Sequence, residues 1–278
     1  MKRFLKIILF ATLAISSLMM IQVFANQVKT SSKYINTTEF LDRNAVHVPF
    51  NLPYFSGIDA NGDFQIIVTS GKQQSVVLNG HPMAVSRVNA SVQNGTLVLR
   101  TVVARSESKS YNPRVLVRII LNHPISAIIL AGKSSLHASG IRTSSLVIYT
   151  RGNSGVYLRG SGNVQRVQND SSRDIDLGWV TSRSIVIAGS GTGWVRLSGG
   201  YADILTARLR NGACLQAENL KANKVYVETE GYSIARIQPV NSLYAFATDD
   251  SNIYYFRVPR EIAGYTKESG NVLKVASW

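Results

Sequence analysis

The chain has 278 residues, of which 45% are hydrophobic and 17% are charged, a composition that excludes general disorder and supplies a large core. Its 30 basic residues outnumber the 16 acidic ones, which gives a formal net charge of +14. The single cysteine, Cys214, excludes an intrachain disulfide framework and a cysteine-based metal site. Because the four histidines lie far apart in the sequence, we expect no metal ion and no cofactor.

Residues 1–25 are typical of a secretory signal peptide. Lys2, Arg3 and Lys6 form a basic start, and residues 7–21 are largely apolar. This apolar stretch is shorter than the roughly 20 residues that a membrane-spanning helix needs, so we expect cleavage rather than anchoring. The mature chain then keeps 27 basic and 16 acidic residues and has no transmembrane segment. We expect an exported protein in the periplasm, at the cell surface or outside the cell.

Residues 26–50 are polar and lack a strong periodicity, so we expect a linker or an N-terminal cap there. Residues 51–278 show no break in composition and are expected to form one domain. The early part of this domain contains short apolar segments and a strong tight-turn signal, Asn94-Gly95. The segments span 64–69, 75–78, 85–92, 96–103 and 114–121.

From about residue 130 the sequence repeats with a period of about 20 residues. Short alternating segments recur at steps of 19 to 21 residues, and turn-forming residues separate them. The first apolar residues of these segments are Leu136, Val156, Ile175, Val195, Cys214, Ala235 and Tyr254. A second column precedes the later six by eight residues and consists of Ile148, Val167, Ile187, Thr206, Val227 and Phe246.

A repeat of this kind predicts stacking. A unit of about 20 residues with two short strands cannot close a core alone, whereas units stacked about 4.8 Å apart align their apolar residues into ladders. We therefore expect an all-β fold, a single-stranded right-handed parallel β-helix (β-solenoid) with rungs of about 20 residues. The alternative is an antiparallel sandwich, whose strands recur about every 8–12 residues. The matching of residue types at the full period favours the solenoid.

Four stretches resemble a known family. Residues 55–71, 94–99, 115–119 and 128–132 are similar, in order and spacing, to the "putative auto-transporter adhesin, head GIN domain" family. The resemblance covers nearly the whole mature chain. It implies a secreted bacterial β-helical domain on the cell surface or in the periplasm. It implies no catalytic residues.

A polysaccharide hydrolase or lyase is the alternative function, because parallel β-helices often carry these enzymes. Such a hydrolase needs two convergent carboxylates roughly 5–9.5 Å apart, and a lyase needs an acidic calcium site. The candidate carboxylates for this role are Asp170, Asp174, Asp176, Asp249 and Asp250. They fall at turns or on separate units, and the acidic residues do not cluster, so we expect no catalytic residues.

One outward side of the expected solenoid combines basic and aromatic side chains. Its members are Tyr157, Arg159, Arg196, Arg236, Tyr255 and Arg257. Arginine beside exposed tyrosine suits acidic polymers such as sulfated or phosphorylated glycans. Scattered solubilising charge is the alternative interpretation of these residues.

The sequence thus predicts an exported cell-envelope binding or adhesion module without catalytic activity, which recognises acidic glycans or other envelope polymers. A structural envelope protein is a further alternative. It would bind another protein or associate with itself through the strand edges at the solenoid ends. Nothing in the sequence matches a nucleic-acid-binding module, so we expect no nucleic-acid partner.

Overall fold

The structure is a computed structural model that describes residues 45–102 and 114–275. The expected signal peptide at 1–25 and residues 26–44 of the expected linker lie outside the described residues. None of the described helices is long and apolar enough to cross a lipid bilayer. Apart from one short helix, α2 (Pro82–Val85), the described secondary structure consists of strands.

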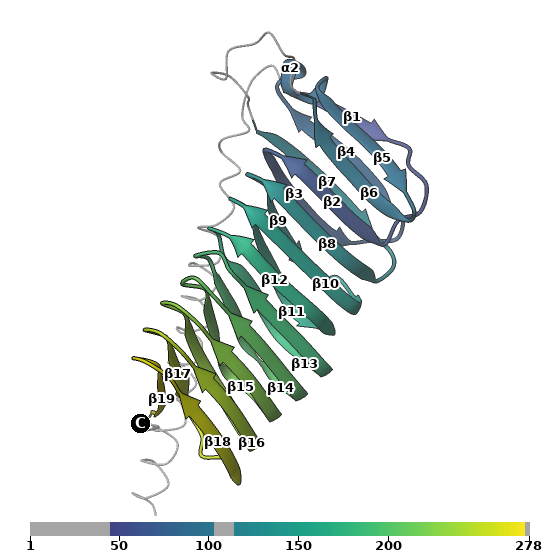
Figure 1. The fold of residues 1–278 in the computed structure, drawn as a ribbon. Helices are drawn as coiled ribbons and strands as arrows, with labels where there is room; N and C mark the ends of the chain where they lie inside the picture. The colour runs from purple at the N-terminus through teal and green to yellow at the C-terminus, as the bar shows by residue number, and fades with distance from the viewer. Residues whose placement is uncertain (1–44, 103–113, 276–278) are drawn as a thin grey trace, which may run out of the picture. The chain divides into compact units, whose positions relative to one another are not determined.

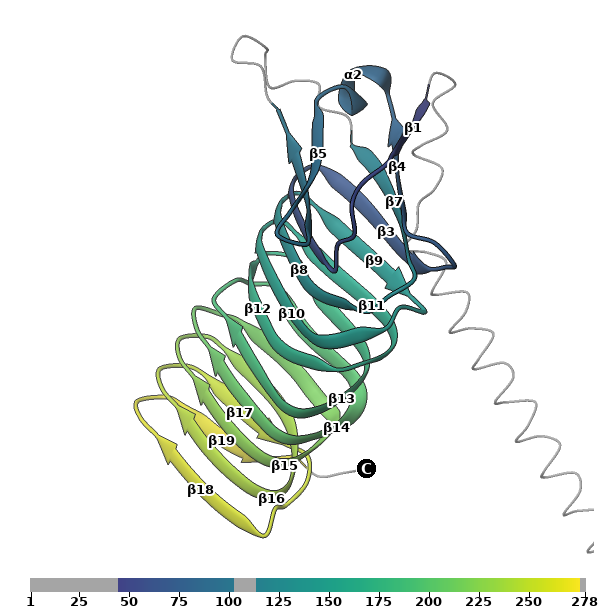
Figure 2. The ribbon, with the colours of Figure 1, turned by 90° about the vertical axis from the view of Figure 1, so that its right-hand side faces the viewer.

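The strands form the expected parallel β-solenoid, with about seven turns and hydrogen-bonded partners about 20 residues apart in the sequence (Figure 1). Each rung contributes one strand segment to each of two ladders, which we call face A and face B. In the later rungs a single long strand supplies both segments, because it runs along face B and bends onto face A (Figure 2). A sharp corner then leads to the next rung.

Face A is the ladder that contains the second half of each long strand. In stacking order its strands are β5 (Val88–Gln93), β6 (Thr96–Thr101), β2 (Gly57–Gly62), β8 (Ile125–Gly132), β10 (Thr143–Gly152), β12 (Val164–Ser171), β13 (Ile175–Gly189), β14 (Trp194–Leu209), β15 (Cys214–Thr229), β16 (Ile234–Ala247) and β18 (Glu261–Thr266).

Face B contains the first halves of β13 to β16. Its remaining strands are β1 (Val46–Phe50), β4 (Ser75–Gly80), β7 (Val115–Leu121), β3 (Phe64–Ser70), β9 (Ser135–Ser139), β11 (Gly155–Gly162), β17 (Asn252–Tyr255) and β19 (Asn271–Lys274).

The stacking order at the N-terminal end differs from the order of the sequence. The rung formed by β2 and β3 lies between the rung of β6 and β7 and the rung of β8 and β9. Antiparallel strands extend this end, since β5 pairs with β6, β4 pairs with β7, and β1 pairs with β4. Strand β1 lies within the region 26–50 for which we expect a linker or cap.

Alternation along the strands builds the core from apolar ladders. Val156 is the register partner of Ile175, which in turn is the partner of Val195, and all three side chains are buried. These partners are those that the repeat predicts. Because each strand buries every second residue, a ladder of this kind runs the length of each face.

The expected register is wrong by one residue in the later rungs. Val195 is paired with Leu215 rather than Cys214, and Ala235 is paired with Ile253 rather than Tyr254. In the second column, Ala207 and Ala245 occupy the positions expected for Thr206 and Phe246. One cause is the bend of β16, where the separation between partners falls from 20 residues at Leu215 and Ala235 to 18 at Val225 and Leu243.

Buried serines line the inside of the corners. The hydroxyls of Ser134, Ser154 and Ser171 donate to the carbonyl oxygens of Gly62, Gly132 and Gly152, at 3.1, 3.3 and 3.0 Å. Each bond reaches the preceding rung of the stack. Each of these carbonyl oxygens also accepts a backbone N–H, from Lys133, Asn153 and Ser172, so the serine hydroxyls satisfy their own donors at the corners and add a second bond between rungs.

Candidate functional site

The six residues of the expected basic and aromatic side do not form one surface. Tyr157, Arg196 and Arg236 share an outward column of face B, as predicted. The whole column consists of His137, Tyr157, Asp176, Arg196, Gln216, Arg236 and Tyr254. The expected outward position of Tyr255 is wrong, because Tyr255 is paired with buried Ile237 and packs against the core.

The remaining two arginines lie outside this column. Arg159 follows Tyr157 by two residues on β11 and is exposed. Arg257 is exposed in the turn after β17 and belongs to no strand.

Acidic side chains neutralise the two arginines of the column. Arg196 Nη1 lies 2.5 Å from Asp174 Oδ2 and 3.1 Å from Asp176 Oδ1. Arg236 Nε lies 3.9 Å from Glu218 Oε1. Both guanidinium groups also cover neighbouring rings, Arg196 that of Trp194 and Arg236 that of Phe256. An acidic ligand would have to compete with carboxylates already in place, so this column is a poor anion site.

At one end of the column, the rings of His137 and Tyr157 are stacked with centroids 4.6 Å apart. Burial, followed by the charges of Arg173 and Arg159, lowers the pKa of His137 to about 4. Burial also raises the pKa of Tyr157. Both rings are therefore neutral near pH 7.

The lowered pKa of His137 predicts a loss of stability in acid. The unfolded chain takes up a proton near pH 6.5, whereas the folded chain does so only near pH 4. The folded state therefore loses stability relative to the unfolded state as the pH falls through this window, and the loss levels off below it. We expect the melting temperature of the native protein to fall more between pH 7 and pH 4 than that of His137→Phe, which keeps a stacked ring but cannot titrate. Parallel melting curves against pH for the two proteins would contradict the assignment.

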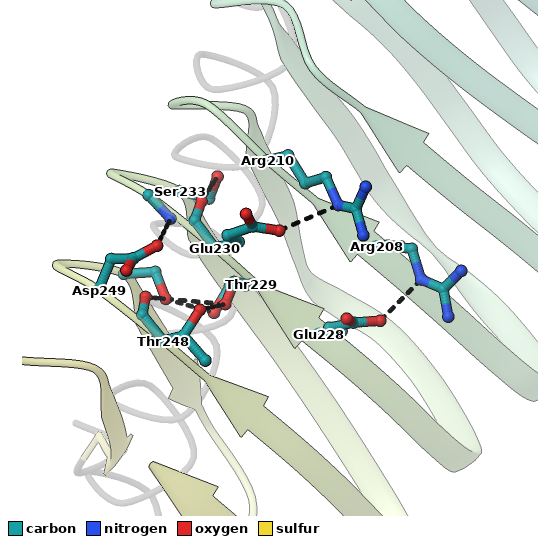
Figure 3. A network of polar contacts seen from close by, with 10 residues as sticks. Arg208, Arg210, Glu228, Thr229, Glu230, Ser233, Thr248 and Asp249 are labelled. Atoms are coloured by element: carbon teal, nitrogen blue, oxygen red, sulfur yellow. Dashed lines mark hydrogen bonds and ion pairs between the residues drawn. The ribbon is translucent and has the colours of Figure 1, made fainter. Parts of the chain in front are cut away.

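The five candidate carboxylates for catalysis mostly have structural partners. Asp174 and Asp176 converge, but both hold the same nitrogen of Arg196. Asp170 accepts hydrogen bonds from Ser190 and Gln168. Asp249 accepts from the backbone N–H of Gly231 in a corner (Figure 3), and Asp250 is exposed in the same turn. Within the described part of the chain, no group of three or more His, Cys, Asp or Glu side chains could hold a metal ion.

Face A carries two outward hollows that the sequence pattern did not reveal. The first, which we call the basic hollow, has a volume of about 430 Å³. Its lining consists of Ser145, Val147, Tyr149, Asn163, Gln165, Arg166, Arg183, Ser184 and Val186. Arg166 and Arg183 are exposed, and neither forms an ion pair with any carboxylate of the described residues. The basic hollow therefore offers two guanidinium groups that have no ion-pair partner among the described residues, beside amides and hydroxyls.

The second hollow, which we call the aromatic hollow, has a volume of about 310 Å³ and lies over β14, β15, β16 and β18. Tyr226 stacks on Tyr244 with ring centroids 4.9 Å apart, and Phe246 stacks on Tyr265 at 5.2 Å. All four side chains are more than a third exposed. Large aromatic groups that are this exposed on a sheet are typical of binding surfaces.

Ion pairs that run between rungs flank the aromatic hollow. Arg208 Nε donates to Glu228 Oε2 at 2.7 Å, and Arg210 Nε lies 3.1 Å from Glu230 Oε2 (Figure 3). Arg208 and Glu228 line the hollow. Its rim thus combines hydrogen-bond donors and acceptors with no net charge.

One outward column connects the two hollows. Register partners lead from Arg166 through Val186 and Thr206 to Tyr226, which lies three rungs away. At the usual strand spacing this separation is about 14 Å. An extended ligand along the solenoid axis could therefore contact both hollows. The regular period is the sequence signal for this column, but the column emerges only when Thr206 is placed outward.

The family described as "Putative auto-transporter adhesin, head GIN domain" matches residues 54–259. No curated protein matches the chain significantly.

Several solved structures share the fold at low sequence identity. A "putative lipid binding protein" from Parabacteroides distasonis has a TM-score of 0.73 at 15% identity, covering 84% of this chain and 98% of its own. A "putative adhesin" from Parabacteroides merdae has a TM-score of 0.74 at 14% identity, with 84% and 97% covered. A "putative adhesin" from Bacteroides fragilis has a TM-score of 0.60 at 18% identity, with the same coverage of 84% and 97%.

Proposed function

The chain belongs to the family described as "Putative auto-transporter adhesin, head GIN domain", and from this premise we propose that it is an exported, non-enzymatic module that binds an acidic glycan or a similar envelope polymer on face A. The observation that carries the proposal is the basic hollow, in which Arg166 and Arg183 have no acidic partner among the described residues. The proposed binding surface thus lies on face A, whereas the column expected from the sequence lies on face B.

The chemistry of the basic hollow suits carboxylated or sulfated sugars. A guanidinium group presents its N–H donors in a planar fork that matches carboxylate and sulfate oxygens. Asn163, Gln165 and Ser184 supply further donors and acceptors, which suit the hydroxyl groups of a sugar. The volume of about 430 Å³ is within the range of about 300–1,000 Å³ that is usual for small-molecule sites.

The contacts that the candidate carboxylates already make support the proposal that the module is not an enzyme. Asp174 and Asp176 are the pair that converges among the five candidates, and Arg196 binds both. The basic hollow has no carboxylate in its lining. A hydrolase would need one carboxylate to donate a proton and a second to activate water or attack the sugar.

We expect Arg166→Gln combined with Arg183→Gln to weaken binding to an immobilised anionic glycan, such as polygalacturonate, by at least about tenfold. Hydrogen bonds to charged groups contribute about 1.5–3 kcal/mol each, so the loss of two should exceed this factor. The double variant should elute at lower salt than the native protein, because fewer ion pairs have to be screened.

The matched control combines Arg159→Gln with Arg257→Gln, which removes the same charge from two exposed arginines that line neither hollow. This control should keep native retention. Equal losses in the two double variants would show that net charge alone causes retention, and unretarded passage of the native protein at low salt would refute the proposal. Release of new chain ends from the polymer by the native protein would identify an enzyme.

A further inference from the structure

The aromatic hollow is built from rings that stand upright on face A. The planes of Tyr226 and Tyr244 differ by 7°, and their centroids are 4.9 Å apart, close to the strand spacing of about 4.8 Å. Rings lying side by side in one plane could not approach so closely. Each ring therefore presents its flat sides along the solenoid axis, toward the rungs before and after it.

The stack of Tyr226 and Tyr244 ends where short side chains begin. The register partner of Tyr226 on the preceding rung is Thr206, and the partner of Tyr244 on the following rung is Ala263. Consequently, no ring of this column covers the flat side of Tyr226 that faces the rung of Thr206. The next residue of the column is Val186, two rungs from Tyr226 and so about 9.6 Å away. We call the gap over the short side chain of Thr206, between Val186 and the ring of Tyr226, the step. It is high enough for one more flat ring.

The rim beside this step is polar and electrically balanced. Arg208 and Glu228 belong to the adjacent outward column, at the levels of Thr206 and Tyr226, and form an ion pair with each other. Arg208 Nε donates to Glu228 Oε2, and among the described residues no other partner binds the remaining guanidinium nitrogens or the second carboxylate oxygen, so these atoms can contact a ligand. A guest that is flat and apolar on one side and carries neutral hydroxyls at its edge fits this combination.

We propose that the step above Thr206 is a stacking subsite for a neutral pyranose ring of a glycan, held against Tyr226 with its hydroxyl groups on Arg208 and Glu228. The proposal rests on the function proposed above, in that both concern one glycan along face A, but it depends on different residues. An acyl chain would leave the charged rim without partners, and an anionic sugar would face Glu228. Sugar rings therefore match the site better than either.

The experiment measures binding of three neutral hexasaccharides, cellohexaose, maltohexaose and chitohexaose, by calorimetry and by saturation-transfer NMR. We expect at least one of them to bind the native protein, with an affinity that does not change between low and high salt. Tyr226→Ala should weaken this binding about tenfold, because the stacking surface is lost. Tyr226→Phe should retain it.

Thr206→Trp tests the step directly, because the indole fills it while Tyr226 stays in place. We expect this variant to abolish binding of the hexasaccharide while keeping the native melting temperature within a few degrees. The matched control is Tyr232→Ala, which removes a tyrosine that is 74% exposed in a corner outside the hollow and should bind as the native protein does.

Several results would overturn the subsite. They are failure of all three hexasaccharides to bind the native protein, native affinity in Thr206→Trp, and native affinity in Tyr226→Ala. The two proposals can fail separately. Salt-sensitive retention on polygalacturonate without neutral binding overturns only the subsite, whereas neutral binding that persists in Arg166→Gln/Arg183→Gln without polygalacturonate retention overturns only the acidic ligand.

Discussion

Gly200→Ala is expected to destabilise the solenoid by about 3 kcal/mol or more, a large effect for the addition of one methyl group. Gly200 lies where β14 bends from face B to face A, and its φ of +131° falls in a region that L-residues rarely adopt. A Cβ atom there would lie 1.9 Å from the carbonyl oxygen of Val180 and 2.8 Å from its backbone nitrogen. Since Val180 is the register partner of Gly200 on β13, neither atom can move without breaking the ladder.

Gly212→Ala is the matched control for this substitution. Gly212 also has a positive φ, +90°, but apart from Gly212 itself and its two chain neighbours no atom of the described residues lies within 4 Å of the position that its Cβ would take. It should cost only the backbone preference of glycine, about 1 kcal/mol. Urea unfolding followed by circular dichroism measures both variants. Equal shifts of the two midpoints would show that close approach of the rungs at the bend does not limit the residue at position 200.

Leu215→Ala is expected to cost about 2–5 kcal/mol, as is usual when a large aliphatic side chain is removed from a closed core. Leu215 is fully buried and stacked between Val195 and Ala235. Gln216→Ala, one residue further along, should change the free energy of unfolding by no more than about 0.5 kcal/mol, because Gln216 points outward.

The pair tests the register of β15 as well as its packing. In the register expected from the sequence, Cys214 points inward and Leu215 points outward, so Leu215→Ala would be nearly neutral. Thermal unfolding of Leu215→Ala, Gln216→Ala and Cys214→Ala distinguishes the two registers. A larger loss for Cys214→Ala than for Leu215→Ala would contradict the pairing of Leu215 with Val195.

The period of the repeat predicts the fold because hydrophobic burial and backbone pairing impose the same spacing. Val156, Ile175 and Val195 are flanked by polar residues or glycine on at least one side, so their inward position is unambiguous. The prediction fails where two apolar residues are adjacent, as at Cys214-Leu215, since either can fill the core. It also fails where a bend changes length, as in β16, because no residue type marks that change.

The N-terminal end could not be predicted for a different reason. Apolar and polar residues alternate along its strands in the same way whether the strands pair in parallel or antiparallel fashion. The contacts of β2 with β6, and of β3 with β7, join segments that are not consecutive in the sequence. Periodicity reports which face of a strand is buried, but not which strand lies beside it.

The candidate site, too, could be predicted only in part from the sequence. The repeat predicts Tyr157, Arg196 and Arg236 on one outward column, yet the ion pairs with Asp174 and Glu218 depend on neighbouring rungs and columns. The aromatic hollow depends on where short side chains interrupt a series of large ones. Such gaps are defined only when the register is known to the single residue.

The central position of the rung of β2 and β3 determines how the solenoid can assemble. This rung is synthesised before both of its neighbours, so each of its two strands has two open edges until later segments arrive. Pairing of β6 with β2 and of β7 with β3 then covers one side of this rung. The next rung, formed by β8 and β9, pairs with the other side of the rung of β2 and β3, and each later rung pairs with the rung that precedes it in the sequence. Antiparallel strands β5, β4 and β1 complete the N-terminal end, so the later rungs extend the solenoid only at its other end.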